Sequence, residues 1–491
     1  MVTRRAWVTD IDAPRNSREL SSQRWFTGAR GLAPGTAGFC QWSLARVCDP
    51  THPPRRSTFR TQLPMHTPRA ARLTAAVCTL TLLLSGRATA EDWPQFRGPT
   101  GGGVSSDKDL PLTWGGPKNE NVVWTADLLG EGIASPVVWK DRLFVVNVSR
   151  KEDDKKADRA QPEQHVACYD TGTGKLKWNT VVPHGPWKRS HSGRPGGGWA
   201  SCTPAADGER VYALFGSSVL VALDHDGKSV WRAELKPHDY DVEMATSPVL
   251  FEKFVIVFCG MKGGSRLVAF DRKTGAVAWD KELKDTGYGH NTPLVIRVKD
   301  EPQLVLMGAG LGTAKNAIQS FDPRTGERLW WCAGKGETSS PVAAKGLVFC
   351  DSGRGGAAKL LDPAGKGDVT TTHMKWQTNL IQGLSSPLVV GDHVYRLFDN
   401  GTFACLDLAT GKELYKERVP GLTSNWASPV ADGAGHIFLA SGGVSVVVET
   451  GPEFKVLATN KLNDANHASP AVAGGRLYIV GAKRLHAVGK K

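Results

Sequence analysis

The sequence predicts an all-β protein, an eight-bladed β-propeller with four-stranded antiparallel blades whose ring is closed by an N-terminal strand. Two repeated motifs lead to this prediction. One places an Asp, a Thr-Gly step and a Trp at fixed separation, and the other is a Ser/Thr-Pro step followed by a β-rich run. The motifs alternate with a period of roughly 40–50 residues, which is typical of propellers with four strands per unit.

The first motif is clearest in "AFDRKTGAVAWD", which runs from Ala269 to Asp280. Asp271 follows an apolar run, and its carboxylate can accept a backbone N–H bond two residues further on and so begin a turn. Gly275 supplies the left-handed residue of a short hairpin loop. The stretch therefore predicts a β-hairpin with a large aromatic residue, Trp279, on its returning strand. The other copies place repeat residues at Asp170, Trp178, Asp224, Trp231, Asp322, Gly326, Trp330, Asp407 and Gly411.

The second motif marks the first strand of each repeat. Proline is tolerated at the first residue of a strand, because its missing N–H is not needed there. Eight copies predict eight blades. They lie at Ser135-Pro136, Thr203-Pro204, Ser247-Pro248, Thr292-Pro293, Ser340-Pro341, Ser386-Pro387, Ser428-Pro429 and Ser469-Pro470.

The last repeat lacks a Trp-bearing fourth strand. After Pro470 the sequence supplies only "AVAGGRLYIV" and "RLHAVGKK". Upstream of the first repeat, Asn121 to Leu128 ("NVVWTADL") carries Trp124 in the Trp position. We expect this segment to complete blade eight, because ring closure removes the open sheet edges that favour aggregation.

The sequence divides into four parts. Residues 1–64 are rich in Arg, Pro and Ser, and we interpret them as a misassigned start or a disordered arm. Residues 65–90 have the layout of a signal peptide, with a basic start, an apolar run and small residues at the end. That run is shorter than the roughly 20 apolar residues of a transmembrane helix, so no membrane anchor is expected. Residues 91–120 form an extended segment and residues 121–491 the propeller. We expect cleavage near Ala90-Glu91 and a periplasmic or extracellular location.

Charge and cysteine content narrow the function classes. The formal net charge is +13, but residues 1–90 hold thirteen arginines and no lysine, and later residues mix both signs. A nucleic-acid partner is therefore not expected. The cysteines beyond residue 90 lie in small-residue or apolar strand positions without zinc or haem spacing, which predicts free, buried thiols. They are Cys168, Cys202, Cys259, Cys332, Cys350 and Cys405.

With these repeats, the sequence from about Asn121 onward resembles the pyrroloquinoline quinone (PQQ) repeat superfamily. This superfamily includes PQQ-dependent alcohol dehydrogenases and cofactor-free propellers such as the BamB-like lipoprotein of outer-membrane assembly. The stretch "EDWPQFRGPTGGGVS" is similar to the opening of exported PQQ-like proteins. The resemblance implies the fold, but the activity has to be argued from the site.

Propeller topology predicts where a ligand would bind. The Thr-Gly turns join the third and fourth strands on one face, and the residues before each Ser/Thr-Pro step rim the channel on the other. The long connections from Ser149 to His165 and from Val182 to Ser201 fall on this rim face, and the second contains Trp187, Arg189, His191 and Arg194. Polar and aromatic rim residues suit a small ligand. The candidate ligand residues are Trp199, Glu243, His290, Asn291, Glu337, Gln382, Asn425, Trp426 and His467.

Two functions follow from this reading. The first is an exported binding or scaffold module, monomeric and without cofactor or metal, that takes a protein, peptide or glycan on the rim face. The second is a divergent PQQ-dependent dehydrogenase with calcium. The resemblance implies an adjacent Cys-Cys disulfide, a Glu/Asn/Asp calcium set and an Asp base for such an enzyme, whereas this sequence has no Cys-Cys pair and no Asp in the rim set. The first function is therefore preferred.

Overall fold

The computed structural model describes most of the chain beyond residue 90. The described ranges are 91–150, 161–186, 198–236, 244–261, 264–309, 317–334, 336–353, 356–380, 383–423, 426–465 and 467–491. The expected extension 1–64 and signal peptide 65–90 lie outside them. Every regular element in these ranges is a β-strand. No helix long and apolar enough to cross a membrane is found among the described residues.

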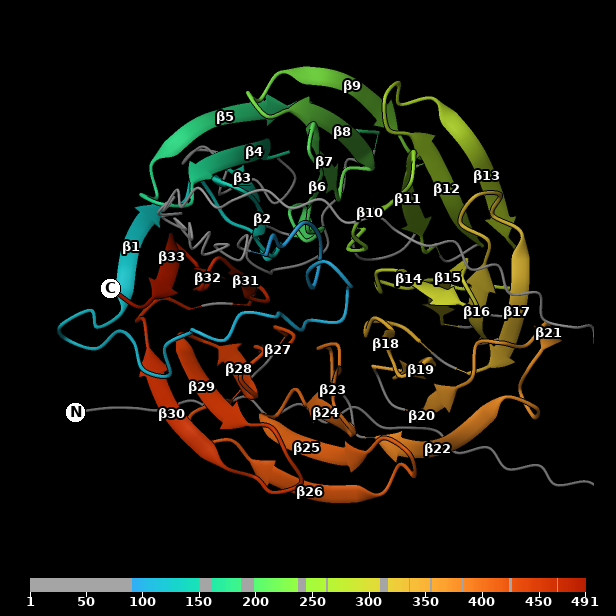
Figure 1. Ribbon diagram of the computed structural model, residues 1–491. Coiled ribbons are helices and arrows are strands. Elements are labelled where there is room, and N and C mark those ends of the chain that lie inside the picture. Colours follow the sequence, from blue (N-terminus) through green and yellow to red (C-terminus); the bar gives the residue numbers. More distant parts are fainter. Residues whose placement is uncertain are drawn as a thin grey trace, which may run out of the picture. The chain divides into compact units, whose positions relative to one another are not determined.

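The strands form eight sheets around a channel, as the repeats predicted (Figure 1). Blade one holds β2 (Val137–Trp139), β3 (Arg142–Ser149), β4 (Glu163–Asp170) and β5 (Leu176–Val182). Blade two holds β6 (Ala205–Ala206), β7 (Arg210–Phe215), β8 (Val219–Asp224) and β9 (Ser229–Glu234). Blade three holds β10 (Val249–Phe251), β11 (Phe254–Cys259), β12 (Ser265–Asp271) and β13 (Val277–Leu283). Blade four holds β14 (Leu294–Val298), β15 (Glu301–Gly308), β16 (Ala317–Phe321) and β17 (Arg328–Ala333).

The remaining blades follow in chain order. Blade five holds β18 (Val342–Ala344), β19 (Leu347–Cys350), β20 (Gly356–Leu361) and β22 (Met374–Leu380). Blade six holds β23 (Leu388–Val390), β24 (His393–Leu397), β25 (Thr402–Asp407) and β26 (Glu413–Arg418). Blade seven holds β27 (Val430–Ala431), β28 (His436–Ser441), β29 (Val444–Glu449) and β30 (Val456–Lys461). Blade eight holds β31 (Ala471–Ala473), β32 (Arg476–Val480), β33 (Arg484–Gly489) and β1 (Val122–Asp127).

Within each blade the strands run antiparallel from the channel outward, and consecutive strands are neighbours. There are two exceptions. β1 pairs with β33 in blade eight, and β21 (Gly367–Asp368) pairs in parallel with β17 and gives blade four a fifth strand. The first strand of every blade begins directly after its Ser/Thr-Pro step. Each blade interface therefore contains inward-facing apolar residues from two neighbouring sheets, and these make up the core.

The predicted ring closure is confirmed. β1 pairs antiparallel with β33, so that Trp124 lies opposite Ala487 and Thr125 opposite His486. The Trp124 ring also lies 6.0 Å from that of Tyr478 in β32. The first strand of the propeller thus completes its last blade, and the edge of β33 that would otherwise be open is paired with β1.

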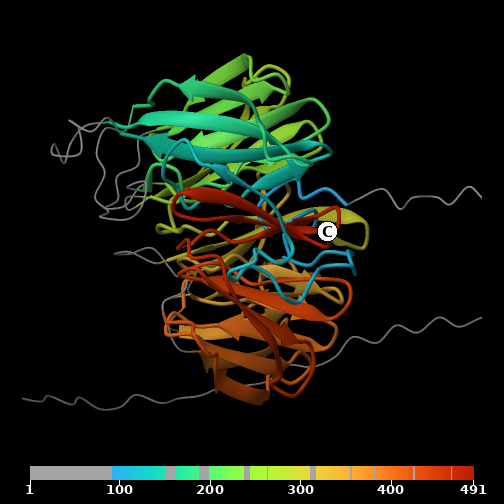
Figure 2. The same cartoon turned by 90° about the vertical axis from the view of Figure 1, so that its left-hand side faces the viewer.

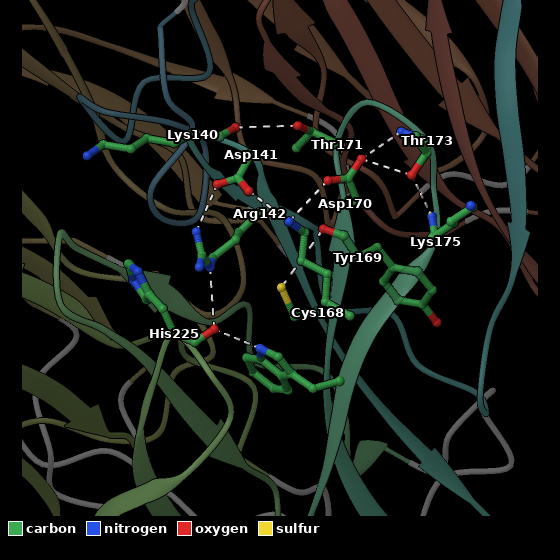
Figure 3. A network of polar contacts seen from close by, with 12 residues as sticks. Lys140, Asp141, Arg142, Cys168, Tyr169, Asp170, Thr171, Thr173, Lys175 and His225 are labelled. Atoms are coloured by element: carbon green, nitrogen blue, oxygen red, sulfur yellow. Dashed lines mark hydrogen bonds and ion pairs between the residues drawn. The ribbon is translucent and has the colours of Figure 1, made fainter.

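The repeated Asp organises the hairpin between the third and fourth strands. In blade three the Oδ1 atom of Asp271 accepts hydrogen bonds from the backbone N–H groups of Lys273 and Thr274, each at 3.0 Å. Gly275 then adopts a φ of 73°, which strongly favours glycine. In blade one Asp170 accepts in the same way from Thr173, and Figure 3 shows this turn with Arg142 pointing toward His225 of blade two.

At five blade interfaces the repeated Trp packs against the turn of the next blade. The indole of Trp231 in blade two lies over Gly275 of blade three so closely that a Cβ atom there would be 2.6 Å from the ring. Its Nε1 donates to the carbonyl of Arg272 at 2.9 Å. The same lock joins Trp124 to Gly174, Trp178 to Gly227 and Trp376 to Gly411, each with an indole bond to a turn carbonyl. The glycine of the turn and the Trp therefore recur together because they touch across blade interfaces, and Trp279 packs on Gly326 in the same way.

The Ser/Thr of the second motif forms a circle of hydrogen bonds around the channel. In each case the backbone N–H of one Ser/Thr donates to the hydroxyl oxygen of its counterpart in the next blade. Seven such bonds of 2.8–3.1 Å run in order through residues 135, 203, 247, 292, 340, 386, 428 and 469. No such bond joins Ser469 to Ser135 in the described part of the chain. The hydroxyl of each Ser/Thr thus links two blades. The proline next to it in the sequence stands directly before the first strand of its own blade.

Ser340→Ala tests this circle. The substitution leaves the buried N–H of Thr292 without its acceptor, and an unpaired buried donor costs about 1–3 kcal/mol. We expect the free energy of unfolding in urea to fall by that amount. Ser445→Ala, at a similarly buried serine of β29 outside the circle, is the control and should cost less. Equal losses in the two variants would contradict the proposed role of the hydroxyl.

A segment upstream of β1, residues 91–109, crosses the channel at the face of the Thr-Gly turns. We call it the strap, and Figure 2 shows it in blue at one side of the ring seen edge-on. Trp93 exchanges two backbone bonds of 2.9 Å with Val138 in blade one, and Ser105 donates to Ala431 in blade seven. Asp107 accepts from the backbone N–H of Gly475 in blade eight at 3.0 Å. A cavity of about 190 Å³ separates the strap from blades three to five.

The closing blade contains a buried titratable residue. His486 of β33 is 4 % exposed, and its ring nitrogens contact Thr125 of β1 at 3.3 Å and Asp464 at 3.1 Å. Burial lowers the pKa of His486, although the carboxylate of Asp464 opposes the shift. In the unfolded chain the histidine has a pKa of about 6.5 and binds the proton more tightly than in the folded protein. The contribution of neutral His486 to the free energy of unfolding is therefore complete above that pH. It is lost as the pH falls toward the lower pKa of the folded protein.

We therefore expect the melting temperature to fall between pH 7.5 and pH 5. His486→Gln should reduce the size of this fall, because its side chain does not titrate, and thermal melts of both proteins across this range are the measurement. Burial lowers the pKa of His165, His184 and His467 as well, so a residual pH dependence should persist in the variant. An unchanged pH dependence would show that His486 is not responsible.

Candidate functional site

The two faces of the ring differ in their connections. On the turn face the first and second strands are joined by tight turns, as between Trp139 and Arg142 or Ala344 and Leu347. On the rim face the connections are longer and unequal, such as 149–163, 182–205, 234–249 and 418–430. Long loops held on a rigid scaffold commonly carry binding residues, so the rim face is the candidate site.

Two rim candidates of blades three and four have backbone roles. Asn291 is fully buried, and its side chain donates to the carbonyl of Met307 at 2.6 Å and accepts from the N–H of Met307 at 3.1 Å. This amide therefore holds β15 to the start of blade four. The backbone N–H of His290 donates to the carbonyl of Glu337 at 2.6 Å, and the side chain of Glu337 is 5 % exposed. The structure thus brings His290 and Glu337 together across two blades.

Trp426 and His467 form an aromatic pair at the rim. Their ring centroids are 5.1 Å apart with an interplanar angle of 39°. They precede the first strands of blades seven and eight, and both side chains are half-buried. The Nδ1 atom of His467 is buried without a hydrogen-bond partner in the described part of the chain. Of the candidate set, this pair offers ring surface at the rim.

The remaining candidates are placed differently or not described. Trp199 is 1 % exposed and packs edge-on against His184 at 5.3 Å, within the core of blades one and two. Its indole is therefore part of the core and not available at the rim. Glu243, Gln382 and Asn425 lie outside the described residues, as do Trp187, Arg189, His191 and Arg194.

Sequence reasoning missed a buried ion pair between blades five and six. Arg396 of β24 is completely buried and pairs through its Nε with Asp351, whose side chain is 2 % exposed. Arg396 also donates to the carbonyls of Ser385 and Leu397. The signal was present in the sequence, because Arg396 is the one charged residue inside the otherwise apolar run "VYRLF". A charge at such a position is rarely fully buried unless it is paired.

The described residues do not provide the calcium set that the PQQ resemblance implies. Asn291, whose amide oxygen could bind calcium, already uses that oxygen for the N–H of Met307. Within the described ranges, no group of three or more His, Cys, Asp or Glu side chains is placed to hold a metal ion. The six cysteines that the structure describes are free and buried, as expected, and burial raises the pKa of the Cys168 thiol to about 12.

Comparison with known proteins identifies relatives of several kinds. The family model described as outer membrane protein assembly factor BamB matches residues 162–417. A curated relative, the tetrathionate hydrolase of Acidithiobacillus ferrooxidans, is 24% identical over 298 residues, which are 56% of this chain and 51% of that protein. The chain therefore spans about half the length of this relative.

Solved structures share the fold. BamB from Moraxella catarrhalis has a TM-score of 0.53 at 16% identity, over 75% of this chain and 97% of that chain. A europium-containing methanol dehydrogenase has a TM-score of 0.61 at 13% identity, over 79% and 89%. The quinohemoprotein alcohol dehydrogenase of Comamonas testosteroni has 0.59 at 14%, over 82% and 81%. At these identities the likeness concerns the fold alone.

Proposed function

The chain belongs to the PQQ-repeat β-propeller family whose model is described as outer membrane protein assembly factor BamB, and from this premise we propose that it is an exported scaffold that binds a protein partner on its rim face. The observation that carries the proposal is the asymmetry of the ring. Long, unequal connections gather on the rim face, whereas the opposite face is made of short repeated turns. Export is supported by the signal-peptide layout of residues 65–90.

The contacts of the turn face support the same choice. Its side chains often join one blade to the next, through the indole locks and through ion pairs such as that between Arg272 of blade three and Asp207 of blade two at 2.9 Å. The strap further covers the channel at this face. A partner that binds there would meet many groups already engaged within the ring. Exposed lysines occur on both faces, such as Lys236 on the rim face and Lys273 on the turn face, and they allow the two faces to be compared.

Charge reversal on the two faces tests the proposal. We expect the double variant Lys236→Glu and Lys284→Glu, on the rim face, to reduce capture of the partner from the cell envelope of the source organism by at least tenfold. The matched control is Lys273→Glu with Lys412→Glu, at equally exposed turn-face lysines, which should leave capture unchanged. The measurement is quantitative affinity pull-down with melting curves on all variants. Loss of capture in the control alone would move the binding site to the turn face.

A second experiment addresses the dehydrogenase alternative, which the solved quinoprotein neighbours favour. Purified protein is mixed with PQQ and calcium, and bound-quinone absorbance and dye reduction with primary alcohols are measured. We expect neither signal, because the described residues lack a calcium set. Stoichiometric PQQ binding with dye reduction would replace the scaffold proposal by the enzyme.

A further inference from the structure

Two arginine side chains from distant parts of the sequence are buried against one short segment beside the channel. Arg97 of the strap is 1 % exposed, and its Nη2 donates to the carbonyl of Pro387 at 2.6 Å. Arg396 of β24 is fully buried and donates to the carbonyls of Gly383 and Ser385, each at 2.5 Å. Both guanidinium groups therefore lie along residues 383–387, which lead into blade six.

In the described part of the chain Arg97 lacks a carboxylate partner at this place, although two carboxylates lie along the same segment. The carboxylate of Asp399 accepts from the backbone N–H of Leu384 at 2.6 Å. Asp351 pairs with Arg396, and no carboxylate pairs with Arg97 among the described residues. The Nε and Nη1 atoms of Arg97 are buried without a hydrogen-bond partner there. Burial, and secondly the charge of Arg396, lower the pKa of Arg97 to about 9. The guanidinium thus remains protonated at neutral pH as a buried charge lacking a counter-charge, an arrangement that is unfavourable in a protein interior.

The strap is built to place this side chain. Gly98 has a φ of 79°, and a Cβ atom there would lie 2.7 Å from the ring of Trp93. Gly103 has a φ of 80°, and its Cβ would lie 2.6 Å from Nη2 of Arg97. Nη2 also donates to the carbonyl of Gly102 at 2.7 Å. A surface arginine turns its charge to water, whereas these contacts fix Arg97 toward the ring.

We propose that Arg97, together with the positive field of Arg396, forms a binding site for one small oxyanion between the strap and blade six. Oxygen atoms of a sulfate-type or carboxylate group would accept hydrogen bonds from Nε and Nη1 and balance the charge, and guanidinium groups are well suited to such anions. Because the strap covers Arg97, the anion enters only when the strap is displaced, and its exchange is slow. The site is independent of the rim-face partner.

Equilibrium dialysis of the full-length protein with radiolabelled sulfate tests the site. We expect one sulfate per chain in the native protein and in Arg272→Met, a control at a turn-face arginine that pairs with Asp207 at 2.9 Å. Arg97→Met, which removes the charge but keeps an apolar stem, should bind at least tenfold more weakly. Competition with acetate distinguishes the anions, since displacement of sulfate indicates a general oxyanion site and its retention indicates preference for a tetrahedral anion.

The proposal is overturned if the native protein binds no sulfate or if Arg97→Met binds it as tightly. Circular dichroism and thermal melts establish that each variant is folded. Should Arg97→Met not fold, Arg97→Lys takes its place, because it keeps the charge but loses the planar set of donors. Arg97→Lys is then expected to bind at least tenfold more weakly, and unchanged binding in this variant would equally overturn the site.

Discussion

Gly275→Ala is expected to destabilise the propeller by about 2–5 kcal/mol. A left-handed backbone conformation costs a residue with a Cβ atom about 1–2 kcal/mol, and overpacking costs about 1–3 kcal/mol more. Both apply here, because Gly275 has a φ of 73° and its Cβ would lie 2.6 Å from the Trp231 indole. Urea unfolding followed by tryptophan fluorescence and circular dichroism gives the difference in free energy.

Gly346→Ala separates the two causes. Gly346, between β18 and β19, has nearly the same φ of 74° but nothing within 4 Å of its would-be Cβ. We expect the free energy of unfolding of this control to fall only by the cost of the left-handed backbone conformation, about 1–2 kcal/mol. Gly275→Ala should also cost less in a Trp231→Ala background, where the indole is absent, and this double-mutant cycle measures the contact directly. Equal losses at Gly275 and Gly346 would mean that the indole does not restrict the turn.

Trp124→Ala is expected to cost about 3–5 kcal/mol, as for other buried large-to-small changes. Trp124 lies on β1, the strand that completes blade eight by pairing with β33. Its indole packs on Gly174 and donates to the carbonyl of Thr171 at 2.9 Å. The substitution thus weakens the strand that closes the ring, and faster unfolding and aggregation should accompany the loss of free energy.

Trp279→Ala is the matched comparison. Trp279 occupies the same repeat position in blade three and packs on Gly326, but its Nε1 has no hydrogen-bond partner among the described residues. It also lies on a strand, β13, that follows directly from β12 in its own blade. We therefore expect a smaller loss at Trp279 than at Trp124. A larger loss at Trp279 would contradict a special role of β1 in closure.

The repeat pattern was sufficient to predict the architecture, because each motif specifies its own turn or strand from residues that are neighbours in the sequence. Asp271 and Gly275 specify a hairpin by their own turn chemistry, and the spacing of the motifs then counts the blades. Trp124 could be assigned to blade eight because it occurs where the last repeat lacks its Trp. The contacts between blades could not be read in this way. The hydroxyl of Ser340, for example, accepts from Thr292 in another repeat, and only the fold brings the two together.

The candidate site was less predictable than the fold. Topology alone suggested the rim face, but it treated every polar residue there as available. Asn291 proved to be committed to the backbone of Met307, and Trp199 to the core. The buried charges of Arg396 and Arg97 were missed because their partners come from other blades or from the strap. Such commitments depend on long-range packing, which periodicity does not encode.

The strap also has a consequence for the order in which the protein matures. Its residues are synthesised before every blade, yet their backbone partners include Ala431 and Gly433 in blade seven, and Asp107 accepts from Gly475 in blade eight. Trp93 and Arg97 therefore cannot acquire their full surroundings until nearly the whole chain has been made. Contacts of such long sequence separation form slowly. The nascent protein must remain an open arc with an undocked N-terminal end until blade eight is complete, and during that interval it depends most on protection from aggregation.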